Sequence, residues 1–181
     1  MHPLISGILL PAATTLFVGL VITPRLEARN RRISAVHQAR DEFSRRVLRI
    51  LSACARLRDT PVPHTLTEER PVLSQRLTAE RQRWIDQLDE ATRYLVDDLE
   101  AFVLSYATPR GRDIAGRFAV YARAVVLSDR PLGTKVERLT ALTGPVQDIF
   151  FTRRWRLITI VSSFQAFEQA VAAIEEEQPS T

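Results

Sequence analysis

The sequence predicts an all-α protein in which an N-terminal single transmembrane helix precedes an antiparallel helical bundle with three long and two short helices. Three observations support this prediction. Residues 3–24 contain no charged residue, residues 21–110 contain no glycine, and apolar residues after Arg25 recur mostly at three- and four-residue spacing. Turn-rich β architectures need more glycine and proline than this, and the apolar spacing is typical of helices that bury one face. We therefore divide the chain into a transmembrane anchor at 1–24, a cytoplasmic helical bundle at 25–176 and a disordered tail at 177–181.

Composition and charge exclude several classes of protein. The chain has 181 residues, of which 45% are hydrophobic, so it can bury a core and is neither collagenous nor disordered as a whole. Cys54 is the only cysteine, which excludes a disulfide-stapled secreted module. Residues 25–58 hold ten Arg and three acidic residues, whereas residues 59–108 hold five Arg and ten acidic residues. Blocks of opposite charge favour segments that lie against each other over one uniform nucleic-acid surface.

The uncharged N-terminal run has the length of a membrane span. As a helix, its 22 residues extend about 33 Å, close to the roughly 30 Å of bilayer hydrocarbon. A cleaved signal peptide is the main alternative, but it needs a basic start, which Met1 and His2 do not provide. A buried core helix is the other alternative, although it rarely needs so long an uncharged run. Arg25, Arg29 and further arginines follow the run directly, which predicts an N-terminus outside the cell membrane and a cytoplasmic C-terminal part.

Small residues within this run mark a candidate helix–helix face. Gly7, Pro11, Thr15 and Gly19 recur at four-residue spacing, so they lie on one slowly drifting face. Small side chains on such a face let a second transmembrane helix approach closely. Small residues are also common in transmembrane helices generally, and Pro11 would bend this one. A contact face made by Gly7, Thr15 and Gly19 is therefore one of two interpretations.

Short clusters that contain proline, often with glycine, aspartate or threonine, separate the helices that we expect after the anchor. Breaks are expected at 59–64, 108–111, 129–133 and 143–145. Between Leu88 and Tyr106 the apolar steps come close to a coiled-coil heptad. The expected helices cover about residues 26–58, 67–107, 112–127, 135–142 and 146–176.

The first two helices are expected to form an antiparallel hairpin that turns between residues 60 and 67. That turn would place Arg40 near Glu90 and Phe43 near Leu88. The hairpin would also return the end of the second helix to the bilayer. We therefore predict one membrane-proximal basic patch, in contact with anionic lipid of the inner leaflet. Its residues are Arg25, Arg29, Arg31, Arg32, Arg110 and Arg112.

A second basic cluster combines three guanidinium groups with an indole, at Arg153, Arg154, Trp155 and Arg156. Three interpretations remain open for it. The cluster could bind an anionic partner, it could lie at the lipid headgroups, or Trp155 could simply pack inward on an ordinary helix surface.

Motifs that carry chemistry are absent from the sequence. There is no GxGxxG, Walker-type loop, HExxH, CxxC or GxSxG. His37 and Asp41 share a helical face, but a metal needs more ligands than these. Asp97 and Glu100 share another face, which a solvated surface explains equally well. No base can be assigned by spacing to Cys54 or to any hydroxyl, so we expect no enzyme, no catalytic residue, no metal and no cofactor.

The expected function is therefore non-catalytic. The leading interpretation is a membrane-tethered helical interaction or scaffold module at the cytoplasmic face. It would bind an unidentified protein partner, and a homo-oligomer is also possible. The alternative is an effector or accessory subunit of a pore or transport complex, which acts on the membrane itself. Nucleic acid is not expected as a partner, because no reading motif is visible and acidic blocks adjoin the basic ones.

Overall fold

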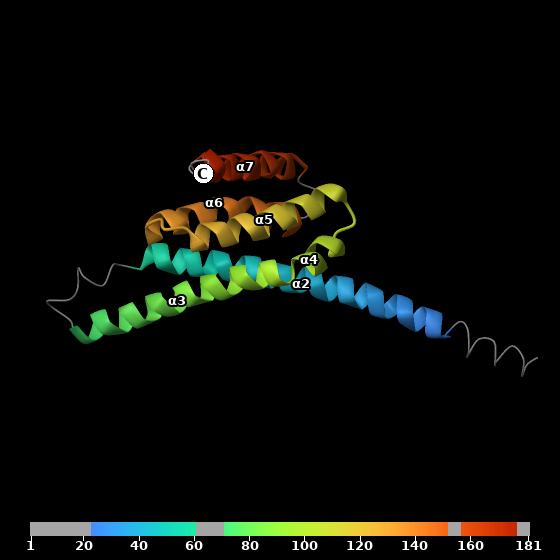
Figure 1. The fold of residues 1–181 in the computed structure, drawn as a ribbon, viewed down its shortest axis with the longest axis horizontal. Coiled ribbons are helices and arrows are strands. Elements are labelled where there is room, and N and C mark those ends of the chain that lie inside the picture. Colours follow the sequence, from blue (N-terminus) through green and yellow to red (C-terminus); the bar gives the residue numbers. More distant parts are fainter. Residues whose placement is uncertain (1–22, 61–70, 152–156, 177–181) are drawn as a thin grey trace, which may run out of the picture. The chain divides into compact units, whose positions relative to one another are not determined.

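A computed structural model describes residues 23–60, 71–151 and 157–176. All regular elements in these ranges are helices, and no strand occurs there, so the predicted helical bundle class is confirmed. None of these described helices combines the length and apolar character needed to cross a membrane. The predicted transmembrane helix falls on residues outside the described ranges. The helices are α2 (Thr23–Asp59), α3 (Pro71–Asp97), α4 (Leu99–Ser105), α5 (Pro109–Leu127), α6 (Leu132–Phe151) and α7 (Leu157–Glu176) (Figure 1).

The chain divides into two units, Met1–Gln38 and Ala39–Thr181. The described part of the first unit is the beginning of α2, which is largely exposed. Within it Arg31 Nη2 lies 3.6 Å from Glu27 Oε2, one helical turn away. The helical bundle belongs to the second unit.

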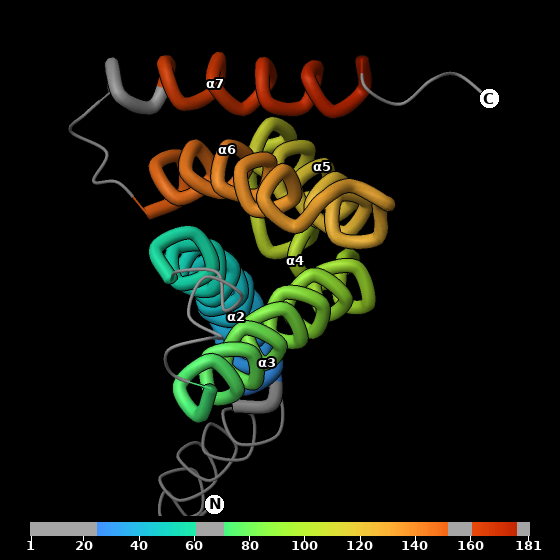
Figure 2. Tube along the Cα trace, turned by 90° about the vertical axis from the view of Figure 1, so that its left-hand side faces the viewer, coloured from blue at the N-terminus to red at the C-terminus, as the bar shows by residue number. Residues whose placement is uncertain are grey.

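In the bundle, α5 and α6 form a central layer (Figure 2). Helix α7 packs on one side of this layer, mainly against α6. On the other side α3 and the part of α2 from Ala39 onward pack as an antiparallel pair, and the short α4 leads from α3 to α5. Each helix therefore buries one face against the central layer, as the apolar spacing predicts.

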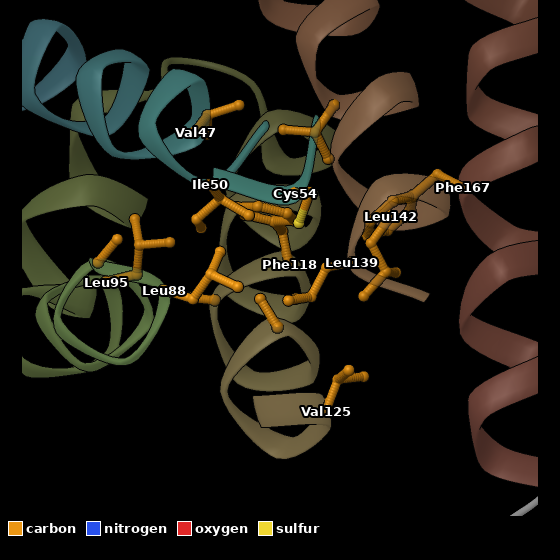
Figure 3. Close-up of a cluster of buried hydrophobic side chains, with 14 of the residues drawn as sticks. Val47, Ile50, Cys54, Leu88, Leu95, Phe118, Val125, Leu139, Leu142 and Phe167 are labelled. Carbon is orange, nitrogen blue, oxygen red and sulfur yellow. The ribbon is translucent and has the colours of Figure 1, made fainter. Parts of the chain in front are cut away.

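The core is built around one phenylalanine. The Phe43 ring makes edge-to-face contacts, with centroid distances of 5.5–5.9 Å, to four aromatic rings: Phe102, Tyr106, Phe118 and Phe150. Side chains from five helices continue this core (Figure 3). They include Val47, Ile50 and Cys54 of α2, Leu88 and Leu95 of α3, Phe118 and Val125 of α5, Leu139 and Leu142 of α6, and Phe167 of α7.

The pairing of α2 with α3 is antiparallel, but its predicted register is wrong. Glu90 lies beside Arg46 and Arg49 instead of Arg40, and Phe43 meets Phe102 instead of Leu88. The prediction assumed a tight turn that aligns the two helix ends. Arg81 Nη1 instead donates hydrogen bonds to the Leu57 and Thr60 carbonyl oxygens, so the first turns of α3 extend beyond the end of α2 (Figure 1).

The predicted helix over 67–107 is two helices in the structure. Asp98 separates them, with φ −101° and ψ 22°, outside the helical region of the backbone map. Its N–H still donates to the Tyr94 carbonyl and its own carbonyl accepts from Phe102, so the interruption is slight. The apolar stripe survives it, because Leu95 and Phe102 are both buried.

The break predicted at 108–111 is in fact the beginning of α5. Thr108 is the N-cap, and its hydroxyl accepts a hydrogen bond of 3.1 Å from the Gly111 N–H. Pro109 occupies the first helical position, where its missing N–H costs nothing. A Cβ on Gly111 would lie only 3.0 Å from Thr108 Oγ1, so a larger residue at this position would crowd the cap.

The break predicted at 143–145 is wrong. Helix α6 continues through Gly144 and Pro145 to Phe151. The predicted division into a short fourth and a long fifth helix is thus replaced by two helices of equal length, α6 and α7, each of 20 residues. Burial of Leu142, Thr143 and Val146 favours the continuous helix over the local preference of Gly-Pro for a turn.

Candidate functional site

The structure gives two of the predicted membrane-facing arginines partners within the bundle. Arg112 Nε donates a 2.8 Å hydrogen bond to the Tyr106 carbonyl, and the Arg110 guanidinium lies 4.8 Å from the centroid of the Phe164 ring. Both side chains remain exposed. The other four residues of the predicted patch, Arg25 to Arg32, are exposed and belong to the first unit. A joint patch therefore remains a prediction.

Two other predicted sites lie outside the described residues. These are the transmembrane face with Gly7, Thr15 and Gly19, and the cluster Arg153, Arg154, Trp155 and Arg156.

Two side chains that could serve as nucleophiles, Cys54 and Tyr106, have raised pKa values. Cys54 is buried, and desolvation raises the pKa of its thiol from 9.0 to about 11, so it is protonated at neutral pH. Burial likewise raises the pKa of Tyr106, whose ring stacks in the core. In the described ranges, no group of three His, Cys, Asp or Glu side chains could hold a metal ion.

The most distinctive polar surface is an open groove between α2 and α3, with a volume of about 530 Å³. Three arginines at spacings of four and seven residues line its α2 side, on the face opposite the buried stripe. A half-exposed Leu48 lies among them. We call this surface the basic groove; its residues are Arg45, Leu48, Arg49, Ser52 and Arg56 of α2, with Gln87 and Glu90 of α3.

Two carboxylates serve the arginines along this side of α2. Glu42 pairs with Arg45 and also accepts a 2.7 Å hydrogen bond from Arg46 Nε. Glu90 Oε1 lies 3.5 Å from Arg46 Nη1 and 3.8 Å from Arg49 Nη1. These longer distances make Glu90 a shared ion-pair partner of two guanidinium groups, with a hydrogen bond to neither.

Arg46 lies beside the groove residue Glu90. Its guanidinium lies 3.9 Å from the centroid of the Tyr94 ring, and its side chain is only 11% exposed. A hydrogen bond to Asp98 raises the pKa of Tyr94, so the ring under Arg46 stays neutral. The buried Nη1 atom of Arg46 has no hydrogen-bond acceptor among the described residues. Arg46 is thus held by stacking and by shared carboxylates.

The sequence analysis did not identify this groove. The sequence did contain a signal for it: Arg45, Arg49 and Arg56 lie on one face of the helix, away from the apolar stripe. What the spacing could not show is that α3 brings only one carboxylate, Glu90, to this groove. Comparison of the chain with models of known protein families, with curated proteins and with solved structures finds no match.

Proposed function

We propose that the chain is a membrane-tethered, non-catalytic helical interaction module at the cytoplasmic face of the membrane. One observation carries the tether: the 22 uncharged residues at 3–24 run directly into the beginning of α2, where four arginines follow within eight residues. An uncharged run of this length matches a bilayer, and flanking arginines favour the cytoplasmic side.

The interaction role is supported by the design of the second unit. Its helices are joined by cross-helix ion pairs, among them Arg123 with Asp89 at 2.6 Å and Arg117 with Glu168 at 2.7 Å. These pairs link α5 to α3 and to α7. These pairs add to one shared apolar core, and the basic groove is part of the helical surface that this bundle presents.

Fractionation of cells that express the full chain tests the tether. We expect the full chain in the membrane fraction, released by detergent and retained at high salt, and a chain that starts at Arg25 in the soluble fraction. The matched control carries Leu10→Arg and Phe17→Arg, because each central arginine costs about 2.5–3.5 kcal/mol of insertion free energy. A soluble full chain, or a control that fractionates like the wild type, would show that residues 3–24 are no anchor.

Orientation and mode of action need separate measurements. A reporter fused after Thr181 should be active in the cytoplasm, and activity outside the cell membrane would contradict the proposed orientation. An interaction module should also leave dye-loaded liposomes intact after reconstitution. Dye release would favour the alternative, an effector that acts on the membrane itself.

A further inference from the structure

The arginines along the basic groove exceed the carboxylates that serve them. Arg45, Arg46 and Arg49 share Glu42 and Glu90, and Arg56 has no carboxylate within 4.0 Å among the described residues. In the described part of the chain, four arginines along this side of α2 therefore have two carboxylates as ion-pair partners. Anionic groups brought by a partner would supply the missing charge and would relieve the sharing of Glu90.

The groove also has an apolar element. Leu48 is 50% exposed, and it lies between the arginines on the same side of α2. The span from Arg45 to Arg56 is about 16 Å along the helix, or three turns. A ligand that fills this length needs an apolar contact at Leu48, about one turn from Arg45, and anionic groups beside Arg49 and Arg56.

The shape favours a helix as the occupant. The surface is concave and runs between two antiparallel helices, and such grooves receive a third amphipathic helix readily. A flat bilayer matches such a concave surface less well than a helix does. A nucleic acid would bring phosphates to the arginines but no aliphatic side chain to Leu48.

From these observations we propose that the basic groove binds an acidic amphipathic helix of a partner protein. Partner carboxylates pair with Arg49 and Arg56, and a partner aliphatic side chain packs on Leu48. This inference deepens the proposed interaction role and rests on it, but it does not depend on the membrane tether.

Binding of a designed peptide to the full chain in a nonionic detergent tests the proposal. The probe is a fluorescent helix of about 25 residues with Glu at spacings of four and seven and Leu on the adjacent positions. The matched peptide has Gln in place of each Glu. By fluorescence anisotropy we expect the Glu peptide to bind, and to bind at least about fivefold more weakly when NaCl rises from about 50 to 300 mM.

Variants locate the binding surface. Arg49→Glu with Arg56→Glu should weaken peptide binding by about tenfold or more, and Arg49→Gln with Arg56→Gln should weaken it less. Arg76→Glu with Arg93→Glu makes the same change in net charge at exposed positions outside the groove and should leave binding unchanged. Leu48→Ala should weaken binding with no change in charge. Circular dichroism and thermal melting of every variant establish that the fold is retained.

Several results would overturn the proposal. Equal binding of the Glu and Gln peptides would exclude charge recognition, and equal loss in the Arg76/Arg93 variant would exclude the groove. Absence of peptide binding at low salt would reject an acidic helix as the occupant. An acidic helix would also be rejected if labelled single-stranded DNA or phosphatidylglycerol micelles bound through Arg49 and Arg56 in place of the peptide. Because all arms use detergent-solubilised chain, failure here leaves the fractionation result intact, and the reverse also holds.

Discussion

Arg40 Nε donates a 2.8 Å hydrogen bond to the main-chain carbonyl of Ser105, across 65 residues of sequence. The acceptor lies at the C-terminal end of α4, where carbonyl oxygens have no partner within the helix. The Arg40 guanidinium also lies 5.4 Å from the centroid of the Tyr106 ring, and Arg112 donates to the Tyr106 carbonyl. Arg40 and Arg112, which are far apart in the sequence, thus both donate hydrogen bonds to carbonyl groups at the end of α4.

Arg40→Ala should therefore destabilise the protein by about 1–3 kcal/mol, because it removes the charge-assisted hydrogen bond that the Ser105 carbonyl oxygen accepts. Urea unfolding followed by circular dichroism measures the loss. Arg93→Ala serves as the control, since Arg93 is exposed, and it should change stability by no more than about 0.5 kcal/mol. Similar effects of the two substitutions would show that the Arg40 contact contributes nothing.

Phe43→Ala should cost about 3–5 kcal/mol of unfolding free energy, because it removes the ring that joins α2 to α4, α5 and α6. For a domain with about 5–15 kcal/mol of total stability, such a loss lowers the midpoint of thermal unfolding strongly. Leu48→Ala, at a half-exposed position on the same helix, is the comparison and should have a much smaller effect. Comparable losses would mean that Phe43 does not sit at the centre of the core.

Two glycine substitutions distinguish the structure from the turn pattern of the sequence. Apart from its chain neighbours and the backbone of its own helix, a Cβ at Gly133 in the first turn of α6 meets no atom within 4 Å, so Gly133→Ala should stabilise α6 by up to about 0.5–1 kcal/mol. A Cβ at Gly111 meets Thr108 Oγ1 at 3.0 Å, so Gly111→Ala should destabilise the protein. Thermal unfolding of both variants gives the signs. A destabilising Gly133→Ala would favour the turn that the sequence predicts at 129–133 over a helix that begins at Leu132.

Stability should fall as the pH rises from 9 toward 11, and Cys54 should account for part of the fall. Its pKa is raised from 9.0 to about 11 in the folded protein, so over this range the unfolded chain loses the thiol proton first. Cys54 contributes about 2–3 kcal/mol to the free energy of unfolding below pH 9, and this contribution is lost as the pH rises through the folded pKa of about 11. Cys54→Ala should show a smaller pH slope, and identical slopes in urea titrations would contradict this assignment.

Periodicity predicted the helices and most of the core, because burial of one face leaves a mark at every third or fourth residue. Phe43, Val47, Ile50, Leu88, Leu95 and Phe118 are buried as their spacing predicts. Helix boundaries were less predictable, since Thr108-Pro109 serves equally as a stop or as an N-cap with proline at the first position. Only tertiary packing decides between these outcomes.

Local preference misled most at Pro145. Proline inside a helix removes a hydrogen bond, so the sequence favours a break there. The packing of Leu142 and Val146 in the core outweighs that cost. The basic groove could not be predicted for a related reason. An arginine stripe is visible in the sequence, but which of its arginines meet a carboxylate of the described residues depends on how α3 lies against α2.

The central position of Phe43 also has a consequence for synthesis. Its ring closes on Phe150, which the ribosome adds more than a hundred residues later. During that interval the apolar stripe of α2 lacks the part of its cover that α6 supplies, and contacts of such long sequence separation form slowly. The nascent chain therefore passes through a stage in which the part of the apolar face of α2 that packs on α6 is still exposed. It is covered only after α6 has left the ribosome.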